Sequence, residues 1–312
     1  MVNNRLPEFV IIGATKSATT WLTTNLRSHP QVFMPSPELH YFSRELDRGD
    51  DWYRAHFAEA GAGQLIGEKS ASYLPHPEAP QRMYRLLPQA KLLVQLRNPV
   101  ERAYSDYCMH YRRGEVSRDI GRYLDARRTP IPRLLDDGLY HRHLMNFRRV
   151  FPPEQIQVLL YDDIRARPGE VFGEVCDFLG IDATVVPKTV DHRVKDKETP
   201  VVPPVARRLL APLKGIVQPY RQARAFVVVR SLIARRLSYP PLTPELRRRL
   251  EAHYAADTAR LAELLGRDLS IWRSGSAERD AAPEDADVKA PERVGRASAQ
   301  TGNAREPGIS VA

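Results

Sequence analysis

The 312-residue chain is poor in the features that build covalently stapled or membrane-bound proteins. It has only two cysteines, Cys108 and Cys176, which excludes a disulfide scaffold and is typical of a reducing compartment. No apolar run comes close to the roughly 20 residues that a transmembrane helix needs. The N-terminal segment also lacks the apolar stretch and the cleavage site of a secretory signal peptide. These absences predict a cytoplasmic protein without a membrane span.

Lysine is scarce as well, with 8 lysines against 39 arginines, and the 47 basic residues outnumber the 38 acidic ones. A positive excess of this size is compatible with nucleic acid, an acidic membrane or a small phosphorylated ligand as partner. A general bias of composition towards arginine explains it equally well, so the net charge identifies no partner. Metal-binding patterns are missing too: there is no H-E-x-x-H motif and no cluster of cysteine and histidine. We expect no metal.

A hydrophobic content of 42% excludes a disordered chain and is sufficient for a large core. Residues 275–312 differ from the rest, because they contain no aromatic residue and no apolar periodicity. This composition predicts a disordered C-terminal tail that follows a single domain over residues 1–274.

Short apolar runs alternate with helical patterns in this domain, which predicts an α/β fold with a central parallel β-sheet flanked by helices. Strands are expected at 9–13, 91–97 and 155–161. Helices are expected at 18–26, 99–111, 170–179 and 243–265. Asn98, Pro99 and Glu101 suit the start of the second helix as an N-cap, a first-turn proline and a capping-box glutamate. The range 191–241 is rich in proline and arginine and predicts no clear element.

The segment GATKSATTW, residues 13–21, lies between the first strand and the first helix. A loop at this position directs backbone N–H groups and the positive end of a helix dipole at one point, which suits a phosphate group. Lys16 adds a positive charge, and Ser17, Thr19 and Thr20 add hydroxyl donors. The loop therefore predicts a nucleotide-type anion.

Neither of the two common nucleotide motifs fits this loop. A Walker A loop requires G-x-x-x-x-G-K-[ST], whereas Lys16 follows Gly13 by only three residues. A Rossmann fingerprint requires three glycines, and Gly13 stands alone. An ordinary strand-to-helix turn with a serine or threonine cap is the structural alternative.

Residues 16–21, KSATTW, resemble the 5′-phosphosulfate loop of sulfotransferases that use 3′-phosphoadenosine 5′-phosphosulfate (PAPS), which reads K-[ST]-G-T-T. Ala18 departs from the family's usual glycine. Residues 97–107, RNPVERAYSDY, are similar to the family's 3′-phosphate motif, in which the residues matching Arg97 and Ser105 hold that phosphate. The resemblance runs from about residue 7 to 272 and implies a three-layer, P-loop-like fold.

Two further segments, residues 37–42 (PELHYF) and 67–73 (GEKSASY), are similar to those of bacterial members and of heparan sulfate N- and 3-O-sulfotransferases. The resemblance implies that Glu38 is the general base, that Lys69 lies near the transferred sulfuryl group and that His40 borders the acceptor. Lys16 would neutralise charge on the leaving phosphate. Glu68 is a weaker rival for the base.

The resemblance also implies a set of cofactor-binding residues: Lys16, Ser17, Ala18, Thr19, Thr20, Trp21, Arg97 and Ser105. Trp21 has two interpretations, since it could stack on the adenine or anchor the helix to the sheet. A basic C-terminal segment closes over the 3′-phosphate in relatives. Here Arg235 and Arg236, or the segment at 192–197, are alternatives for that role.

The resulting hypothesis is a sulfotransferase that moves a sulfuryl group from PAPS to a hydroxyl or amine of a small-molecule, glycolipid or carbohydrate acceptor. A kinase or NTPase with a degenerate P-loop is the alternative, and it would need Mg²⁺ with an acidic ligand such as Asp162 or Asp163. A nucleic-acid-binding protein is a third possibility that rests on the arginine excess. The absence of a recognition motif counts against it.

Overall fold

The computed structural model describes residues 5–187, 189–190 and 237–273. The tail at 275–312 lies outside the described residues, as do Arg235, Arg236 and the segment at 192–197. None of the helices in the described ranges has the length and apolar character needed to cross a bilayer.

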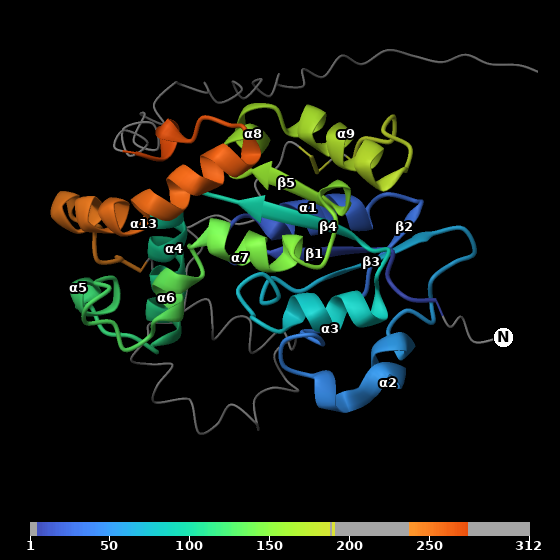
Figure 1. Ribbon diagram of the computed structural model, residues 1–312, viewed down its shortest axis with the longest axis horizontal. Helices are drawn as coiled ribbons and strands as arrows, with labels where there is room; N and C mark the ends of the chain where they lie inside the picture. Colours follow the sequence, from blue (N-terminus) through green and yellow to red (C-terminus); the bar gives the residue numbers. More distant parts are fainter. Residues whose placement is uncertain (1–4, 188, 191–236, 274–312) are drawn as a thin grey trace, which may run out of the picture. The chain divides into compact units, whose positions relative to one another are not determined.

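The centre of the described domain is a five-stranded parallel sheet with the strand order β2-β3-β1-β4-β5 (Figure 1). Its strands are β1 (Phe9–Gly13), β2 (Val32–Phe33), β3 (Leu65–Lys69), β4 (Lys91–Leu96) and β5 (Ile156–Leu160). The predicted α/β class is therefore confirmed, and the three predicted strands are present to within one residue at each end. The sequence did not reveal β2, which has only two residues, or β3, whose LIGEK sequence includes two charged side chains.

Ten α-helices and three 3₁₀ turns accompany these strands in the described ranges. The α-helices are α1 (Thr19–Arg27), α2 (Gly49–Ala55), α3 (Ala79–Leu86), α4 (Pro99–Arg113), α5 (Ile120–Tyr123), α6 (Arg133–Asp136), α7 (Tyr140–Arg148), α8 (Tyr161–Ala166), α9 (Pro168–Leu179) and α13 (Pro244–Leu265). The 3₁₀ turns are η1 (Leu46–Arg48), η2 (Pro153–Gln155) and η5 (Ser270–Trp272). Four of these helices, α1, α4, α9 and α13, correspond to the predicted ones.

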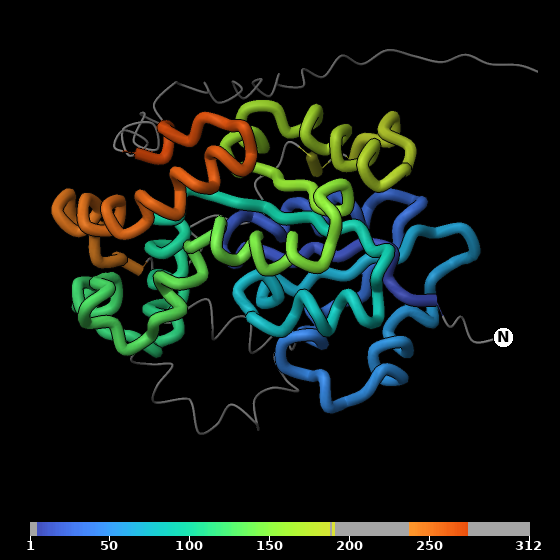
Figure 2. Tube along the Cα trace, viewed as in Figure 1, coloured from blue at the N-terminus to red at the C-terminus, as the bar shows by residue number. Residues whose placement is uncertain are grey.

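Helices cover both faces of the sheet, which gives three layers (Figures 1 and 2). Val10 and Ile12 of β1 point to the face covered by α2, α3 and α7, and a cluster of buried apolar side chains fills the space between them. Phe9 and Ile11 point to the opposite face and pack against α1 and α9. Because both faces are covered, β1 is a continuous apolar run rather than an alternating one, as is usual for buried parallel strands.

A third apolar cluster joins α4 to α5, α6 and α13. Helix α4 begins with two of its three predicted features: Asn98 Oδ1 accepts the Val100 N–H at 2.9 Å and Pro99 occupies the first helical position. The third, a capping-box contact of Glu101, is not formed, because Glu101 binds Arg247. Asn98 Nδ2 also donates to the carbonyl of Trp272 at 2.9 Å. This contact fixes the C-terminal turn against the start of α4.

Candidate functional site

The candidate site lies where three neighbouring parallel strands end. Strands β3, β1 and β4 are adjacent in the sheet, and their carboxyl ends meet at one edge. Lys69 ends β3, the loop with Lys16 follows β1, and Arg97 follows β4. Crevices at this edge of open α/β sheets commonly bind ligands. The topology thus brings together residues from three of the four segments that carry the family resemblance.

The loop after β1 is shaped by backbone conformations that side chains rarely adopt. A Cβ on Gly13 would lie 2.8 Å from Leu74 Cβ, so only glycine fits there. Lys16 (φ 64°) and Ala18 (φ 61°) are both in the left-handed region, which explains why glycine is usual at the position of Ala18 in the sulfotransferase motif. No side chain among the described residues caps the start of α1. Its first N–H groups can therefore bind an anion.

Ser17 points inward from this loop and is completely buried. Its hydroxyl lies beside that of Tyr140, and neither group makes a hydrogen bond of normal geometry within the described part of the chain. Burial raises the pKa of Tyr140 to about 12, so this hydroxyl stays protonated. Ser17 and Tyr140 thus place two buried hydroxyls directly behind a helix start that has no side-chain cap.

Trp21 lies on the sheet side of α1 and is only 6% exposed. Its ring N–H donates to the carbonyl of Val190 at 2.7 Å, and its ring meets that of Phe172 edge-on at 6.5 Å. In this arrangement the indole anchors α1, as one of the two interpretations expects. A role against adenine stays a prediction.

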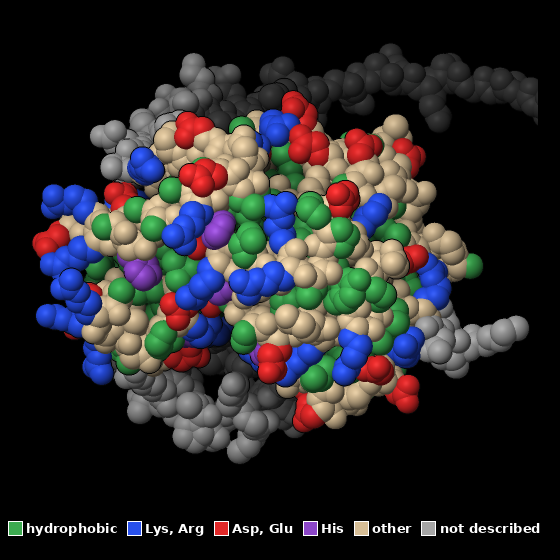
Figure 3. Space-filling model, viewed as in Figure 1, with side chains coloured by type: hydrophobic (Ala, Val, Ile, Leu, Met, Phe, Trp, Pro, Cys, Tyr) green, Lys and Arg blue, Asp and Glu red, His purple; other side chains and the backbone are tan. Residues whose placement is uncertain are grey.

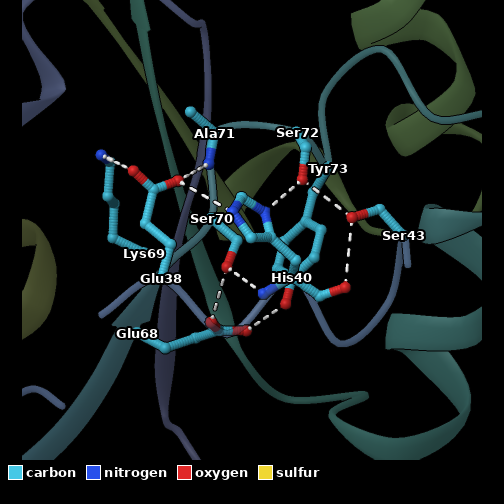
Figure 4. A network of polar contacts seen from close by, with 9 residues as sticks. All are labelled: Glu38, His40, Ser43, Glu68, Lys69, Ser70, Ala71, Ser72 and Tyr73. Atoms are coloured by element: carbon cyan, nitrogen blue, oxygen red, sulfur yellow. Dashed lines mark hydrogen bonds and ion pairs between the residues drawn. The ribbon is translucent and has the colours of Figure 1, made fainter. Parts of the chain in front are cut away.

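Glu38 is held between a lysine and a backbone amide at the end of β3 (Figure 4). Lys69 Nζ lies 2.5 Å from Glu38 Oε1, and the Ala71 N–H donates to Oε2 at 3.1 Å. Burial raises the pKa of Glu38, but the charge and hydrogen bonds of Lys69 and Ala71 outweigh it and hold that pKa below its ordinary value. Arg27 supports the same loop by donating to the carbonyls of Met34 and Pro35. Glu38 is therefore an ionised carboxylate in a fixed position.

His40 lies beside this pair, with Nε2 4.0 Å from Glu38 Oε2. Its backbone N–H donates to Ser70 Oγ at 2.9 Å, and Nδ1 lies 2.8 Å from Ser72 Oγ. Ser43 Oγ lies 2.8 Å from Ser72 Oγ and extends the chain of hydroxyls (Figure 4). Burial lowers the pKa of His40, so the imidazole is neutral at physiological pH.

Glu68 points away from Glu38, into the core, and is 1% exposed. It accepts hydrogen bonds from the hydroxyls of Tyr53 at 2.9 Å, Tyr73 at 2.8 Å and Ser70 at 3.1 Å. Burial raises the pKa of Glu68 to about 7 despite these three donors. Because Ser70 also accepts the N–H of His40, Glu68 supports the site from behind.

Arg97 lies between β4 and α4, and Ser105 lies on α4, about two turns further along the chain. The Arg97 guanidinium lies over the ring of Tyr161, 4.9 Å from its centroid, and Nη2 is 3.8 Å from Glu101 Oε2. Ser105 is half-buried and follows Glu101 by one helical turn, on the same face of the helix.

A comparison with known families agrees with this geometry. The family model described as "Sulfotransferase domain" matches residues 6–199, which is more than half of the chain. The chain belongs to the sulfotransferase family.

Individual relatives agree with that family. Heparan sulfate glucosamine 3-O-sulfotransferase 6 of Mus musculus is 36% identical over 193 residues, which cover 59% of this chain and 55% of that protein. The bifunctional heparan sulfate N-deacetylase/N-sulfotransferase 3 of Homo sapiens is 33% identical over 197 residues, which cover 57% of this chain and 23% of that protein. The chain thus spans about half, or less, of the length of these curated relatives.

Among solved structures, a sulfotransferase from Alicyclobacillus acidocaldarius is similar, with a TM-score of 0.64 and 28% sequence identity. The similarity covers 86% of this chain and 99% of that one. It extends the resemblance of the fold beyond the range of the family model.

This family member contains a buried ionic cluster behind the phosphosulfate-type loop that the sequence did not reveal. Arg102 of α4 is completely buried, donates to the carbonyl of Leu134 and lies 3.5 Å from Asp106. Asp137 faces Arg102 and accepts a hydrogen bond from the hydroxyl of Thr15 at 3.4 Å. The spacing of Arg102 and Asp106 was a local signal for an ion pair, but their connection to Thr15 depends on distant segments.

A pocket of about 480 Å³ lies beside the His40 network and shares Ser43 with it. Its other lining residues are Arg44, Leu46, Asp47, His76 and Arg82. Groups of three or more histidine, cysteine or acidic side chains arranged to hold a metal ion are absent from the described residues.

Replacing Ala18 by glycine should stabilise the protein. Glycine adopts a φ of 61° without the crowding that costs an L-residue about 1–2 kcal/mol, although its extra freedom in the unfolded chain offsets about 0.5–1 kcal/mol. We expect the free energy of unfolding, measured by urea denaturation, to rise by roughly 0.5–1 kcal/mol. The control Ala256→Gly, at an exposed position of α13, should lower it by about 1 kcal/mol. An equal loss of unfolding free energy in both variants would contradict the left-handed conformation of Ala18.

Replacing Lys69 by methionine should raise the pKa of Glu38, because burial then acts without the ion pair that opposes it. The pKa is measured by ¹³C NMR titration of the Glu38 carboxyl group. In the wild type, the lowered pKa of Glu38 stabilises the folded protein at any pH above the pKa of glutamate in the unfolded chain. This stabilisation disappears as the pH falls through the pKa of Glu38 in the folded protein. The stability difference between wild type and variant should therefore shrink in acid. The control is Lys91→Met. Because the Lys91 ammonium donates to the carbonyl of Phe178, its removal should leave the pKa of Glu38 unchanged.

Proposed function

We propose that the protein is a sulfotransferase that moves a sulfuryl group from PAPS to a hydroxyl or amine of a small-molecule, glycolipid or carbohydrate acceptor. The observation that carries this proposal is the Glu38–Lys69 ion pair, held at the end of β3 next to the strand that leads into the phosphate-type loop. The pair offers a proton acceptor and a positive charge in one place. Sulfuryl transfer needs both, because positioning and charge stabilisation dominate such reactions.

The β1–α1 loop supports PAPS as the donor. When bound, PAPS would supply an activated sulfuryl group joined to a phosphate. Lys16, Ser17, Thr19 and Thr20, with the first N–H groups of α1, would hold the 5′ end, and Arg97 and Ser105 the 3′-phosphate. The uncapped helix start and the buried Ser17 hydroxyl fit the first of these groups.

Glu38 would remove the proton from the attacking hydroxyl or amine. While Lys69 stays bound to it, its lowered pKa makes it a weak base. A shift of Lys69 towards the sulfuryl oxygens would remove this influence, raise the pKa of Glu38 and stabilise the transferred group at the same time. The neutral His40, 4.0 Å from Glu38, would then orient the acceptor.

The pocket beside His40 supports a polar acceptor. Arg44 and Arg82 line it together with Asp47, and this net positive lining would attract carboxylate or sulfate groups. Relatives named for heparan sulfate are consistent with an acidic carbohydrate among the candidate acceptors.

The contacts of the two candidate magnesium ligands count against a kinase or NTPase. Asp162 accepts the ring N–H of Trp272 at 2.8 Å, and Asp163 binds Arg267 through both carboxylate oxygens, at 3.1 and 3.0 Å. Both aspartates are thus engaged in contacts with the C-terminal segment.

Donor binding tests the proposal directly. Isothermal titration calorimetry should detect binding of adenosine 3′,5′-bisphosphate, the donor's product, with an affinity that EDTA does not change. Lys16→Ala should weaken this binding by roughly tenfold or more, because it removes a charge-assisted contact. A loss of binding in EDTA, or a preference for ATP with Mg²⁺, would support the kinase alternative instead.

Glu38→Gln should lower kcat by about 10²–10⁴ while leaving the affinity for adenosine 3′,5′-bisphosphate unchanged. The assay is transfer from PAPS, followed by mass spectrometry, to an acceptor found in a screen of sugars, glycolipids and phenols. Gln31→Glu, which leaves Glu38 intact, is a control outside the site. Near-normal turnover by Glu38→Gln would move the base to His40 or Glu68.

A further inference from the structure

Three charged side chains meet at the start of α4, where the 3′-phosphate is expected. Arg247 of α13 places Nη2 2.5 Å from Glu101 Oε1, while Arg97 Nη2 is 3.8 Å from Oε2 of the same carboxylate. The side chains of Arg97, Glu101 and Arg247 are 14%, 13% and 18% exposed. This partial burial makes their interactions stronger than those of surface ion pairs.

Arg247 differs from its neighbours in the sequence. It begins a run of three arginines, in which Arg248 and Arg249 are exposed. Basic side chains are visible around the exposed side of α13 in Figure 3. Arg247 instead turns towards α4, 146 residues away in the sequence.

Glu101 has a different partner from the one its sequence position predicts. A capping-box glutamate turns back to the N-cap residue, whereas the Glu101 carboxylate binds Arg247. Asn98 provides the side-chain cap of α4, through its bonds to the N–H groups of Val100 and Glu101.

The two distances show how the negative charge of Glu101 is shared. A carboxylate four residues after an arginine tends to pair with it, and that pairing would cancel the charge that Arg97 needs to hold a phosphate. The 2.5 Å contact with Arg247 is a charge-assisted hydrogen bond, whereas 3.8 Å is too long for one. Arg97 is supported by the ring of Tyr161 instead. Its guanidinium therefore keeps donors available for an anion.

We propose that Arg247 is a positioning residue for recognition of the donor's 3′-phosphate: by binding Glu101, it leaves Arg97 available for that phosphate. The inference rests on the proposed use of Arg97 in donor binding. It makes selectivity for nucleotides with a 3′-phosphate dependent on a residue of α13, outside the strand-loop-helix motif itself.

Affinities for adenosine 3′,5′-bisphosphate and for adenosine 5′-monophosphate, measured by calorimetry, test this role. Arg247→Gln should weaken binding of the bisphosphate by roughly tenfold and leave binding of the monophosphate unchanged, because only the first has a 3′-phosphate. Arg247→Lys, which keeps the charge, should bind close to wild type. Arg249→Gln is the matched control: it removes the same charge from the same helix, where Arg249 pairs with Glu245 and Asp125.

The double variant Glu101→Gln/Arg247→Gln decides the mechanism. It should recover most of the lost affinity, since no carboxylate remains to cancel Arg97. If the double variant binds adenosine 3′,5′-bisphosphate as weakly as Arg247→Gln does, the proposal is overturned, because Arg247 would then contact the phosphate itself or only support the fold. The proposal is also overturned if Arg247→Gln and Arg249→Gln bind adenosine 3′,5′-bisphosphate with the same affinity.

The wild-type protein separates this inference from the proposed function. If it binds the bisphosphate no better than the monophosphate, use of the 3′-phosphate itself is wrong. If it prefers the bisphosphate and this preference is unaffected by Arg247→Gln, only the role of Arg247 is wrong. Thermal unfolding of each variant identifies losses of affinity that arise from misfolding.

Discussion

Parallel hydrogen bonding between β3, β1 and β4 is the constraint on which the site depends. Since neighbouring parallel strands end at the same edge, the residues that follow them are brought together however far apart they are in the sequence. The segment after β3 also packs against β1: the N–H groups of Ser70 and Leu74 donate to the carbonyls of Ile11 and Ile12. Gly13 fits against this segment only because it lacks a Cβ. The sheet thus positions the ion pair and the loop as one unit.

Several cations near this edge are partnered by carboxylates. Lys69 pairs with Glu38, Arg247 with Glu101, and the fully buried Arg102 lies beside Asp106 and Asp137. Pairing of this kind lowers the free-energy cost of burying each charge and holds it in one position. A few cations of the basic chain are thus held in fixed orientations around the candidate site.

Hydroxyl groups fix the geometry around Glu38 without adding charge. Ser70 connects the backbone of His40 to the buried Glu68, and Ser72 connects the His40 ring to Ser43. His40 has a φ of 54°, which is unusual for a residue with a Cβ. The hydrogen bond from its N–H to Ser70 supports this conformation. Such a network fixes the side chains of the candidate site in advance, and preorganisation of this kind reduces the reorganisation that a reaction requires.

The sequence by itself determined β1, β4 and β5 and the helices α1, α4, α9 and α13, because apolar runs, helical spacing and the cap at Asn98 are local properties. It also placed Lys16, Arg97 and Ser105 on strand-loop-helix units through their resemblance to two motifs. Only the tertiary structure decided which side chains meet. Strand β3 is too polar to be recognised alone, Lys69 reaches Glu38 across 31 residues, and Glu101 binds Arg247 rather than its own helix end. These contacts depend on how distant segments pack, and neither periodicity nor a motif contains that information.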